Sequence, residues 1–202
     1  MDTFSNLPNE KKERIITAAQ TAFGRNGYKK ASIQDIATAA EISKAMLFHY
    51  FGSKKALYIF LVNHSTETVA QEIETRFGSG VTDFFEQAML IAEMRIAIMN
   101  RQPALLSFLK SIYNETASDV ADDIERILSE ARRPVVEFGV ISEPDVSPFK
   151  PDVDPRIASK LLTAYIDSLF DERAWGEGFE PEWIMRDMRQ CTELLRNHFY
   201  KK

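Results

Sequence analysis

One short stretch of the chain carries side chains that suit contact with the polar edges of another molecule. In residues 43–51, the positions that face outward from a helix hold Lys44, Ala45, Met46, Phe48 and His49. They include one cation and two rings but no acid, whereas an ordinary solvated face mixes both charge signs. A short helix of this kind, braced by a preceding helix, is what docking into a DNA major groove requires. The alternative is a surface helical hairpin in some other all-helical protein.

Two helices with almost no gap between them would position these side chains. Residues 32–40 carry one apolar face at i, i+3, i+4 and i+7, made of Ile33, Ile36, Ala37 and Ala40. Ser32 and Asp35 match the Ser/Thr-x-x-Asp/Glu pattern that caps a helix start. After a break at 41–42, Ser43 can cap a second helix, whose inward face is Leu47, Tyr50 and Phe51. The spacing predicts a helix-turn-helix.

Further residues at fixed spacings flank this motif. They are Arg14-Ile15-Ile16-x-Ala18-Ala19-x-x-x-Phe23-x-x-x-Gly27-Tyr28 before it and Leu47-Phe48-His49-Tyr50-Phe51-x-x-Lys54-x-x-Leu57 at its end. With them, the stretch from roughly 10 to 60 resembles the N-terminal domain of the TetR family of bacterial transcriptional regulators. The many coinciding spacings make the resemblance specific, but it says little about the remaining two-thirds of the chain.

The resemblance implies that the second helix of the motif reads base edges through Lys44, Ala45 and His49. The chemistry of these residues suits that role, because Lys can donate to guanine O6 and N7 and Ala can touch a thymine methyl group. Gln34, which projects from the first helix, could also reach a base edge.

The resemblance also implies phosphate contacts by Ser43, Tyr50 and Lys54. Lys54 stands near the start of the following helix, a place that already favours anions. Ser32 could hold a further phosphate, although capping alone would explain it.

Two residues depart from the family pattern. Phe48 stands where a Tyr is usual, so the hydroxyl that would bond a phosphate is missing and only ring contact remains. Glu41 stands in the turn where Gly is usual, and Gly adopts a left-handed conformation far more easily than Glu. The geometry of the turn is therefore in question.

The composition is typical of a soluble, all-α globular protein. Of 202 residues, 45% are hydrophobic and 27% charged, with only 8 Gly and 8 Pro. The lone Cys191 permits no intrachain disulfide, which suits a reducing compartment. No N-terminal segment resembles a signal peptide, and the most apolar run, 88–99, contains Glu93 and Arg95. We expect a cytoplasmic protein that does not enter the membrane.

The net charge of -5 conceals an uneven distribution. Residues 1–60 hold nine Lys or Arg and five Asp or Glu, a net charge of +4, and the rest of the chain has a net charge of -9. A basic N-terminal part on an acidic body is expected if only that part meets phosphate.

Enzyme chemistry has little support. There is no Glu-x-x-His pair, as a di-iron bundle would need, and no Gly-rich phosphate loop. A Ser/His/Asp or Cys/His arrangement stays open, since it would not show in the sequence. We expect no enzyme activity, no cofactor and no metal.

Periodicity and breaks predict nine helices in two domains. We expect a helix-turn-helix domain over residues 1–52 and a larger helical effector-binding and dimerisation domain over 53–202. Pro134 predicts a kink or early end of its helix, and residues 139–153 read as an irregular loop. The expected helices cover about 8–26, 32–40, 43–51, 53–77, 81–100, 103–116, 118–138, 154–175 and 181–200.

Large, deformable side chains in the second domain could line a pocket for a small hydrophobic or amphipathic effector. The alternative is that they form ordinary core, and for His64 that it packs between helices. The candidate effector-binding residues are His64, Phe85, Met89, Phe108, Tyr113 and Tyr165.

The last two helices carry apolar stripes through which members of the family form homodimers. The alternative is that these stripes are buried within one protomer. The residues are Ala158, Leu161, Leu162, Tyr165, Leu169, Ile184, Met188, Cys191, Leu194 and Leu195.

The resemblance and the residues together predict a homodimeric regulator that binds a palindromic double-stranded DNA operator. A repressor released by its effector is the expected form. The alternatives are an activator of the same family, or a helical ligand-binding protein or enzyme whose helix-turn-helix is only structural.

Overall fold

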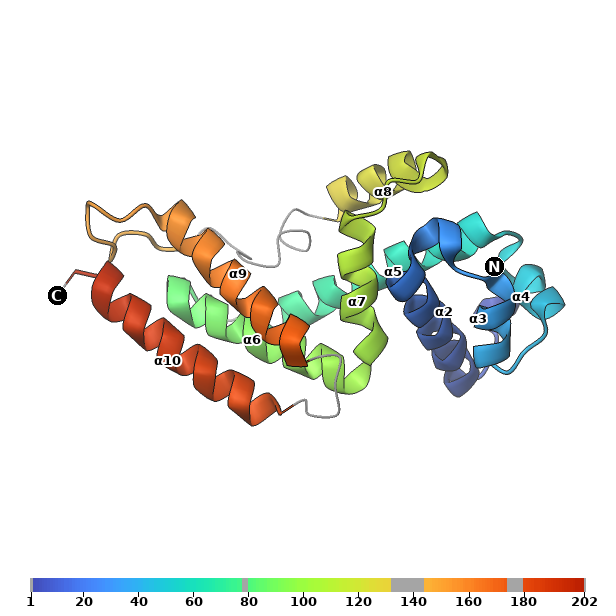
Figure 1. The fold of residues 1–202 in the computed structure, drawn as a ribbon, viewed down its shortest axis with the longest axis horizontal. Helices are drawn as coiled ribbons and strands as arrows, with labels where there is room; N and C mark the ends of the chain where they lie inside the picture. Colours follow the sequence, from blue (N-terminus) through green and yellow to red (C-terminus); the bar gives the residue numbers. More distant parts are fainter. Residues whose placement is uncertain (1, 78–79, 132–143, 174–179, 202) are drawn as a thin grey trace. The chain divides into compact units, whose positions relative to one another are not determined.

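The structure, a computed structural model, describes residues 2–77, 80–131, 144–173 and 180–201, and every regular element in these ranges is an α-helix (Figure 1). The predicted all-α fold is confirmed. Isolated β-bridges pair Asp83 with Asp145 and Phe149 with Tyr200. The helices are α1 (Asp2–Ser5), α2 (Asn9–Lys30), α3 (Ile33–Ala39), α4 (Lys44–Phe51), α5 (Lys54–Phe77), α6 (Phe84–Arg101), α7 (Pro103–Tyr113), α8 (Ser118–Glu130), α9 (Pro155–Arg173) and α10 (Pro181–Phe199).

Packing divides the chain into two units. The first comprises residues 1–68 and 101–131, and the second comprises residues 69–100 and 132–202. The first unit extends past residue 52 because α7 packs extensively on α2. The predicted boundary between residues 52 and 53 separates a helix-turn-helix domain from an effector-binding and dimerisation domain. The packing units do not test this division, so it stays a prediction.

The interior of the first unit is built on the apolar stripe of α2. Gly24 lets α7 approach this helix closely, because a Cβ at Gly24 would lie 2.9 Å from Ser107 Oγ and 3.1 Å from Phe108 N. Any side chain here would require the backbone of α7 to move. Fully buried on the stripe, at the predicted spacing, are Ile15, Ala19 and Phe23.

The first long helix is interrupted where the sequence predicts its end. Gly27 adopts a left-handed conformation, with φ of 68°, and interrupts the helix there, in agreement with the predicted end at about residue 26. A further helical turn continues across this kink, so that α2 as a whole ends at Lys30. At this kink the Tyr28 N–H donates to Glu115 Oε2 at 2.7 Å. The other oxygen of Glu115 accepts from the backbone at Thr116 and Ala117, so one carboxylate links α2 to the start of α8.

Most other helix boundaries follow their local signals. Pro103 lies in the first turn of α7, and Asp154 Oδ1 accepts from Arg156 N at 2.8 Å at the start of α9. Helix α8 ends at Glu130, four residues before Pro134. Residues 132–143, which include Pro134, and residues 174–175 of the helix predicted over 154–175 lie outside the described residues. Helix α1 was not predicted.

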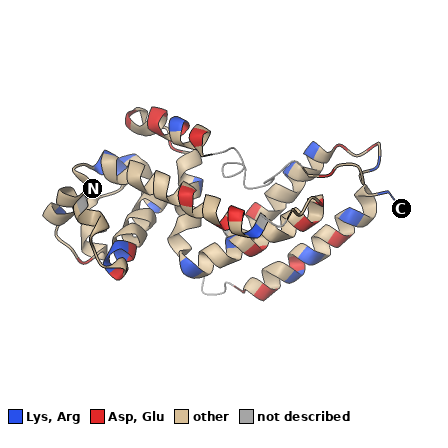
Figure 2. Ribbon diagram, turned by 180° about the vertical axis from the view of Figure 1, so that it is seen from behind, with Lys and Arg blue, Asp and Glu red and all other residues tan. Residues whose placement is uncertain are grey.

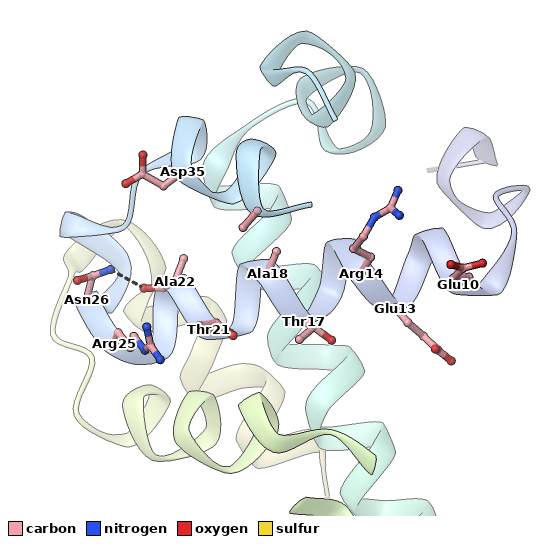
Figure 3. A pocket seen from close by; sticks show the side chains of 11 residues that line it. Glu10, Glu13, Arg14, Thr17, Ala18, Thr21, Ala22, Arg25, Asn26 and Asp35 are labelled. Atoms are coloured by element: carbon pink, nitrogen blue, oxygen red, sulfur yellow. Dashed lines mark hydrogen bonds between the residues drawn. The ribbon is translucent and has the colours of Figure 1, made fainter. Parts of the chain in front are cut away.

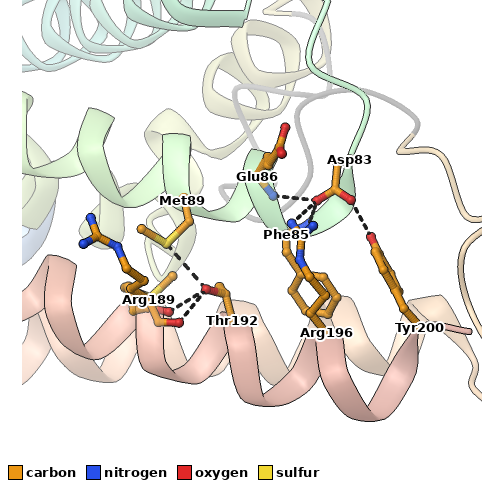
Figure 4. A network of polar contacts seen from close by, with 9 residues as sticks. Asp83, Phe85, Glu86, Met89, Arg189, Thr192, Arg196 and Tyr200 are labelled. Atoms are coloured by element: carbon orange, nitrogen blue, oxygen red, sulfur yellow. Dashed lines mark hydrogen bonds and ion pairs between the residues drawn. The ribbon is translucent and has the colours of Figure 1, made fainter. Parts of the chain in front are cut away.

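Polar contacts of Asp83 close one end of the second unit (Figure 4). Asp83 Oδ1 accepts from Phe85 N and Glu86 N at 3.0 Å each and thereby caps α6. The same oxygen pairs with Arg196 Nη2 at 2.7 Å, and the Tyr200 hydroxyl donates to Asp83 Oδ2 at 3.1 Å. The start of α6 is thus tied to the end of α10.

Within the described ranges, no helix combines the length and the apolar character that crossing a bilayer needs. The same ranges bring together no group of three His, Cys, Asp or Glu side chains that could hold a metal ion.

Candidate nucleic-acid interface

Helices α3 and α4 turn their apolar sides inward and keep their polar starts capped. Ser32 Oγ accepts from Asp35 N at 3.2 Å, and Ser43 Oγ accepts from Met46 N at 3.1 Å. Both predicted N-caps are confirmed. The inward residues of both helices pack into the core, and the opposite side of each helix is exposed. The buried residues are Ile36, Ala37 and Ala40 before the turn and Leu47, Tyr50 and Phe51 after it.

The turn between α3 and α4 contains a left-handed residue. Glu41 has φ of 54°, a conformation that costs a non-Gly residue about 1–2 kcal/mol. Arg14 of α2 contacts two consecutive residues of this turn: its Nε donates to Ala40 O at 3.0 Å, and its Nη1 lies 3.1 Å from Glu41 Oε2. The turn therefore has the left-handed geometry that Gly usually adopts, although its residue is Glu41.

The outward side of α4 holds the predicted base-reading residues. Lys44, Ala45, Met46, Phe48 and His49 are all exposed. The Lys44 ammonium lies 5.9 Å from the ring centroid of Phe48, within range of a cation–π interaction. This exposed side presents a cation, two rings and a thioether, with no acid anywhere on the helix, which is the combination that the sequence predicts.

The predicted residues of α3 differ in how far they project. Gln34 is exposed, and its amide nitrogen reaches Thr38 Oγ1 at 3.4 Å. Thr38, on the same exposed side, donates to Gln34 O at 2.9 Å. Ser32 is half-buried and uses its oxygen as a cap, so a phosphate contact by Ser32 stays a prediction.

All three main predicted phosphate ligands have contacts within the protein, since Ser43 Oγ already caps α4. Tyr50 is buried, with 5% of its surface exposed. Lys54 Nζ donates to Lys29 O at 3.0 Å and lies 5.1 Å from the ring of Tyr28. Burial lowers the pKa of Lys54, although nearby acids oppose the shift. An ammonium has three donors, so Lys54 can still offer a bond to phosphate. Ser43 is exposed, and all three contacts stay predictions.

Acidic residues are concentrated on one helix of the first unit. Helix α8, at the upper left of Figure 2, carries five acids and one Arg. Lys55 Nζ pairs with Asp123 of this helix at 2.9 Å. The basic residues instead gather at both ends of α2 and at the start of α5, namely Lys11, Lys12, Lys29, Lys30, Lys54 and Lys55.

A shallow groove runs along α2 beside α3 (Figure 3). Glu10, Glu13, Arg14, Arg25 and Asp35 contribute to its lining. Charges of both signs make it unlike the apolar effector pocket that the sequence predicts, and none of the six predicted effector residues lines it.

The six predicted effector residues are divided between the two units. The first unit holds His64, Phe108 and Tyr113, and the second holds Phe85, Met89 and Tyr165. Neither unit by itself therefore brings the set together, and a shared pocket stays a prediction.

Within the first unit, Phe108 is buried, whereas Tyr113 is 46% exposed. His64 is half-buried, with its ring stacked at 5.9 Å on Phe60. Burial lowers the pKa of His64, and Glu67 opposes the shift.

Within the second unit, Phe85 is buried and Met89 lies on the side of α6 that meets α10 (Figure 4). Thr192 Oγ1 contacts Met89 Sδ at 3.7 Å. The Tyr165 hydroxyl donates to Asp187, and burial together with this acid raises its pKa.

The sequence does not predict the residue that supports the turn. Arg14 belongs to the family motif, but its partner Ala40 lies 26 positions away along the chain. The one available signal was Glu41, whose unusual place in the turn implies a compensating partner.

The comparison with known proteins points to the same part of the chain. The sequence family described as bacterial regulatory proteins, tetR family, matches residues 15–59. This range includes most of α2, all of α3 and α4, and the start of α5.

Relatives extend the similarity beyond this range. The uncharacterized HTH-type transcriptional regulator YuxN of Bacillus subtilis is 27% identical over 136 residues, which cover 66% of this chain and 44% of YuxN. The HTH-type transcriptional repressor KstR of Mycobacterium tuberculosis is 21% identical over 127 residues, which cover 61% of this chain and 57% of KstR. The chain thus spans about half the length of these curated relatives.

A solved structure supports the fold of the whole chain. The crystal structure of a TetR family transcriptional regulator from Chloroflexus aurantiacus J-10-FL matches with a TM-score of 0.72 at 21% identity. The match covers 100% of this chain and 99% of that chain, and at this identity it shows a shared fold. The capped helix-turn-helix, the matched motif and the relatives agree: residues 15–59 form a domain of the tetR family of bacterial regulatory proteins.

Proposed function

We propose that the chain is a sequence-specific transcriptional regulator that inserts α4 into the major groove of a double-stranded operator. The observation that carries this proposal is the exposed side of α4, where Lys44, Ala45, Phe48 and His49 project from a helix without acids. Caps and the Arg14 contacts hold that helix in one geometry. Base reading needs such a pre-positioned helix, because each bidentate contact depends on the position of its donor.

The chain acts as a homodimer through α9 and α10 in this proposal. Ile157, Leu161 and Leu194 are 59%, 54% and 60% exposed on these helices, and exposed large apolar side chains on one pair of helices favour an interaction surface there. Buried within the protomer, by contrast, are Ala158, Leu162, Leu169, Ile184 and Met188. A twofold dimer presents two α4 helices to a palindromic site.

The proposed regulator is a repressor that a small hydrophobic or amphipathic effector releases from DNA. The name of KstR supports repression. The helix that could transmit the signal is α5, which contributes residues 54–68 to the first unit and 69–77 to the second. An effector shifts the equilibrium only by its difference in affinity for the two shapes, typically about 1–3 kcal/mol of coupling.

Selection of bound duplexes from a random pool tests the DNA-binding part. We expect enrichment of a palindromic site whose affinity falls steeply as salt is raised, because phosphate contacts release counterions. No enrichment, or binding that does not respond to salt, would favour a helical ligand-binding protein or enzyme.

A small-molecule thermal-shift screen, followed by operator titration with each hit, tests the release. A true effector weakens operator binding, whereas a ligand that binds and leaves operator affinity unchanged would refute the coupling. A reporter gene behind the selected site should become more active when the regulator is deleted, and lower activity would indicate an activator.

A further inference from the structure

Helix α1 lies outside the residues 15–59 that the family match covers. It is a single turn, Asp2–Ser5, joined to α2 through a short connection in which Leu7 N donates to Phe4 O at 3.1 Å. Phe4 is only 5% exposed although it stands almost at the start of the chain. A terminal aromatic ring is buried only if the folded chain offers it partners.

The partners of Phe4 come from the inward side of α4 and from α5. Its ring centroid lies 4.8 Å from that of Phe51, 6.1 Å from that of Tyr50 and 5.2 Å from that of Phe60. Phe51 and Phe60 are themselves 5.2 Å apart. These distances fall within the range in which aromatic pairs attract one another.

We propose that Phe4 is a positioning residue for α4, and that α1 holds this helix at the angle from which it reads DNA. Helix α4 has eight residues and buries only Leu47, Tyr50 and Phe51. Phe4 contacts two of those three, so α1 supplies a large part of the surface on which α4 rests. Phe60 joins the same cluster from α5, which fixes α4 against the next helix as well.

The consequence for DNA binding is specific. Base edges are read by side chains on the outward face of α4, and their hydrogen bonds tolerate little displacement. Binding to a random duplex depends instead on phosphate charge and tolerates a loosened helix. Loss of Phe4 therefore lowers operator affinity more than it lowers random-duplex affinity. This inference rests on the proposed function of α4.

The test compares Phe4→Ala and Phe4→Leu with a matched control, Phe23→Leu. Phe23 is fully buried and packs on Tyr28, Tyr58 and Phe108, away from the Phe4 cluster. Phe4→Leu keeps apolar volume and guards against unfolding of the Ala variant. Each variant is titrated with the selected operator and with a random duplex, below its own unfolding temperature.

We expect Phe4→Ala to weaken operator binding about tenfold and random-duplex binding less than twofold, with Phe4→Leu in between. Phe23→Leu should leave the ratio of the two affinities unchanged even if it lowers the melting temperature as much. Equal effects of the Phe4 and Phe23 variants on that ratio would overturn the proposal.

Hydrogen exchange followed by mass spectrometry provides a readout that does not need DNA. In Phe4→Ala, amides of α4 should exchange faster while amides of α7 keep their rates. If the unmodified protein selects no duplex, the proposed function fails, and exchange alone then decides whether Phe4 positions α4. Unchanged exchange in α4 would overturn the positioning role whatever the DNA result.

Discussion

Lys44 and Lys54 are both basic residues of the predicted interface, yet their surroundings differ. Lys44 is exposed on α4 beside the ring of Phe48. Lys54 is held by Lys29 O and the ring of Tyr28, and its pKa is lowered by burial. In the proposed interface the exposed Lys44 reads a base edge, and the fixed Lys54 binds a phosphate.

We predict that Lys44→Ala relaxes sequence preference at one position of the operator, where discrimination falls by about 1–3 kcal/mol. Lys54→Ala should weaken all duplexes alike and lower the salt slope by about one. Titrations of operator variants at several salt concentrations measure both effects. Arg126→Ala, which removes an exposed cation from the acidic helix α8, is the control. If the Lys44 and Lys54 variants behave alike, the assignment of Lys44 to base reading and of Lys54 to phosphate binding is wrong.

A second prediction at this scale concerns His64, whose pKa is lowered from its usual 6.5 by burial. Between the lowered pKa and 6.5 the unfolded chain binds more protons than the folded one, so the free energy of unfolding falls as pH decreases through this window. His64→Phe, which can still stack on Phe60, should lose less stability there. Urea unfolding at about pH 7.5 and about pH 5.5 measures the difference, since the two proteins share every other ionisable group. An equal loss in both would contradict the prediction.

At the scale of elements, the helix-turn-helix depends on contacts from α2. Helix α2 carries Arg14, which fastens the turn, and its close approach to α7 at Gly24 anchors it from the other side. The turn with its left-handed Glu41 is thus stabilised from outside the motif rather than by the motif itself.

Arg14→Ala should lower the free energy of unfolding by about 1 kcal/mol, mainly because the bond to Ala40 O is lost. Glu41→Gly should raise it by up to about 1 kcal/mol, because relief of the left-handed conformation exceeds the added freedom of the unfolded chain. In the double variant the cost of Arg14→Ala should shrink by less than about 0.5 kcal/mol, since the exposed ion pair contributes little. Chemical unfolding of the four proteins gives this cycle. If Glu41→Gly instead lowers the free energy of unfolding, the contacts of the Glu41 carboxylate contribute more stability than the left-handed backbone costs.

At the scale of the whole molecule, the proposed function requires a second protomer. In that proposal one α4 helix reads about half a palindrome, and the exposed apolar residues of α9 and α10 provide a surface to cover. We predict that Leu161→Glu combined with Leu194→Glu gives a folded monomer with weak operator affinity. Sedimentation velocity and circular dichroism measure mass and helicity. Tyr113→Glu, which replaces another exposed large residue, should remain dimeric. A dimer that survives the double change would place the interface elsewhere.

Much of the fold could be predicted because its signals are local. Ser32 and Ser43 were recognised as caps, and Pro103 and Asp154 as helix starts, since a cap acts on amides within three residues of itself. Apolar spacing likewise predicted the inward faces of α2, α3 and α4. The sequence did not predict that α2 continues past Gly27. A helical turn resumes there, and the Tyr28 N–H donates to Glu115, which lies 87 positions away.

By itself, the sequence determined that the chain is helical, where most helices begin, and which side of α4 faces outward. Helical periodicity and caps depend only on residues within about a turn of one another. Only the tertiary structure decided that Arg14 holds the turn, that Phe4 lies under α4, and that the predicted effector residues fall into two packing units. Such contacts join distant parts of the chain, and they depend on how whole helices pack, which no local pattern encodes.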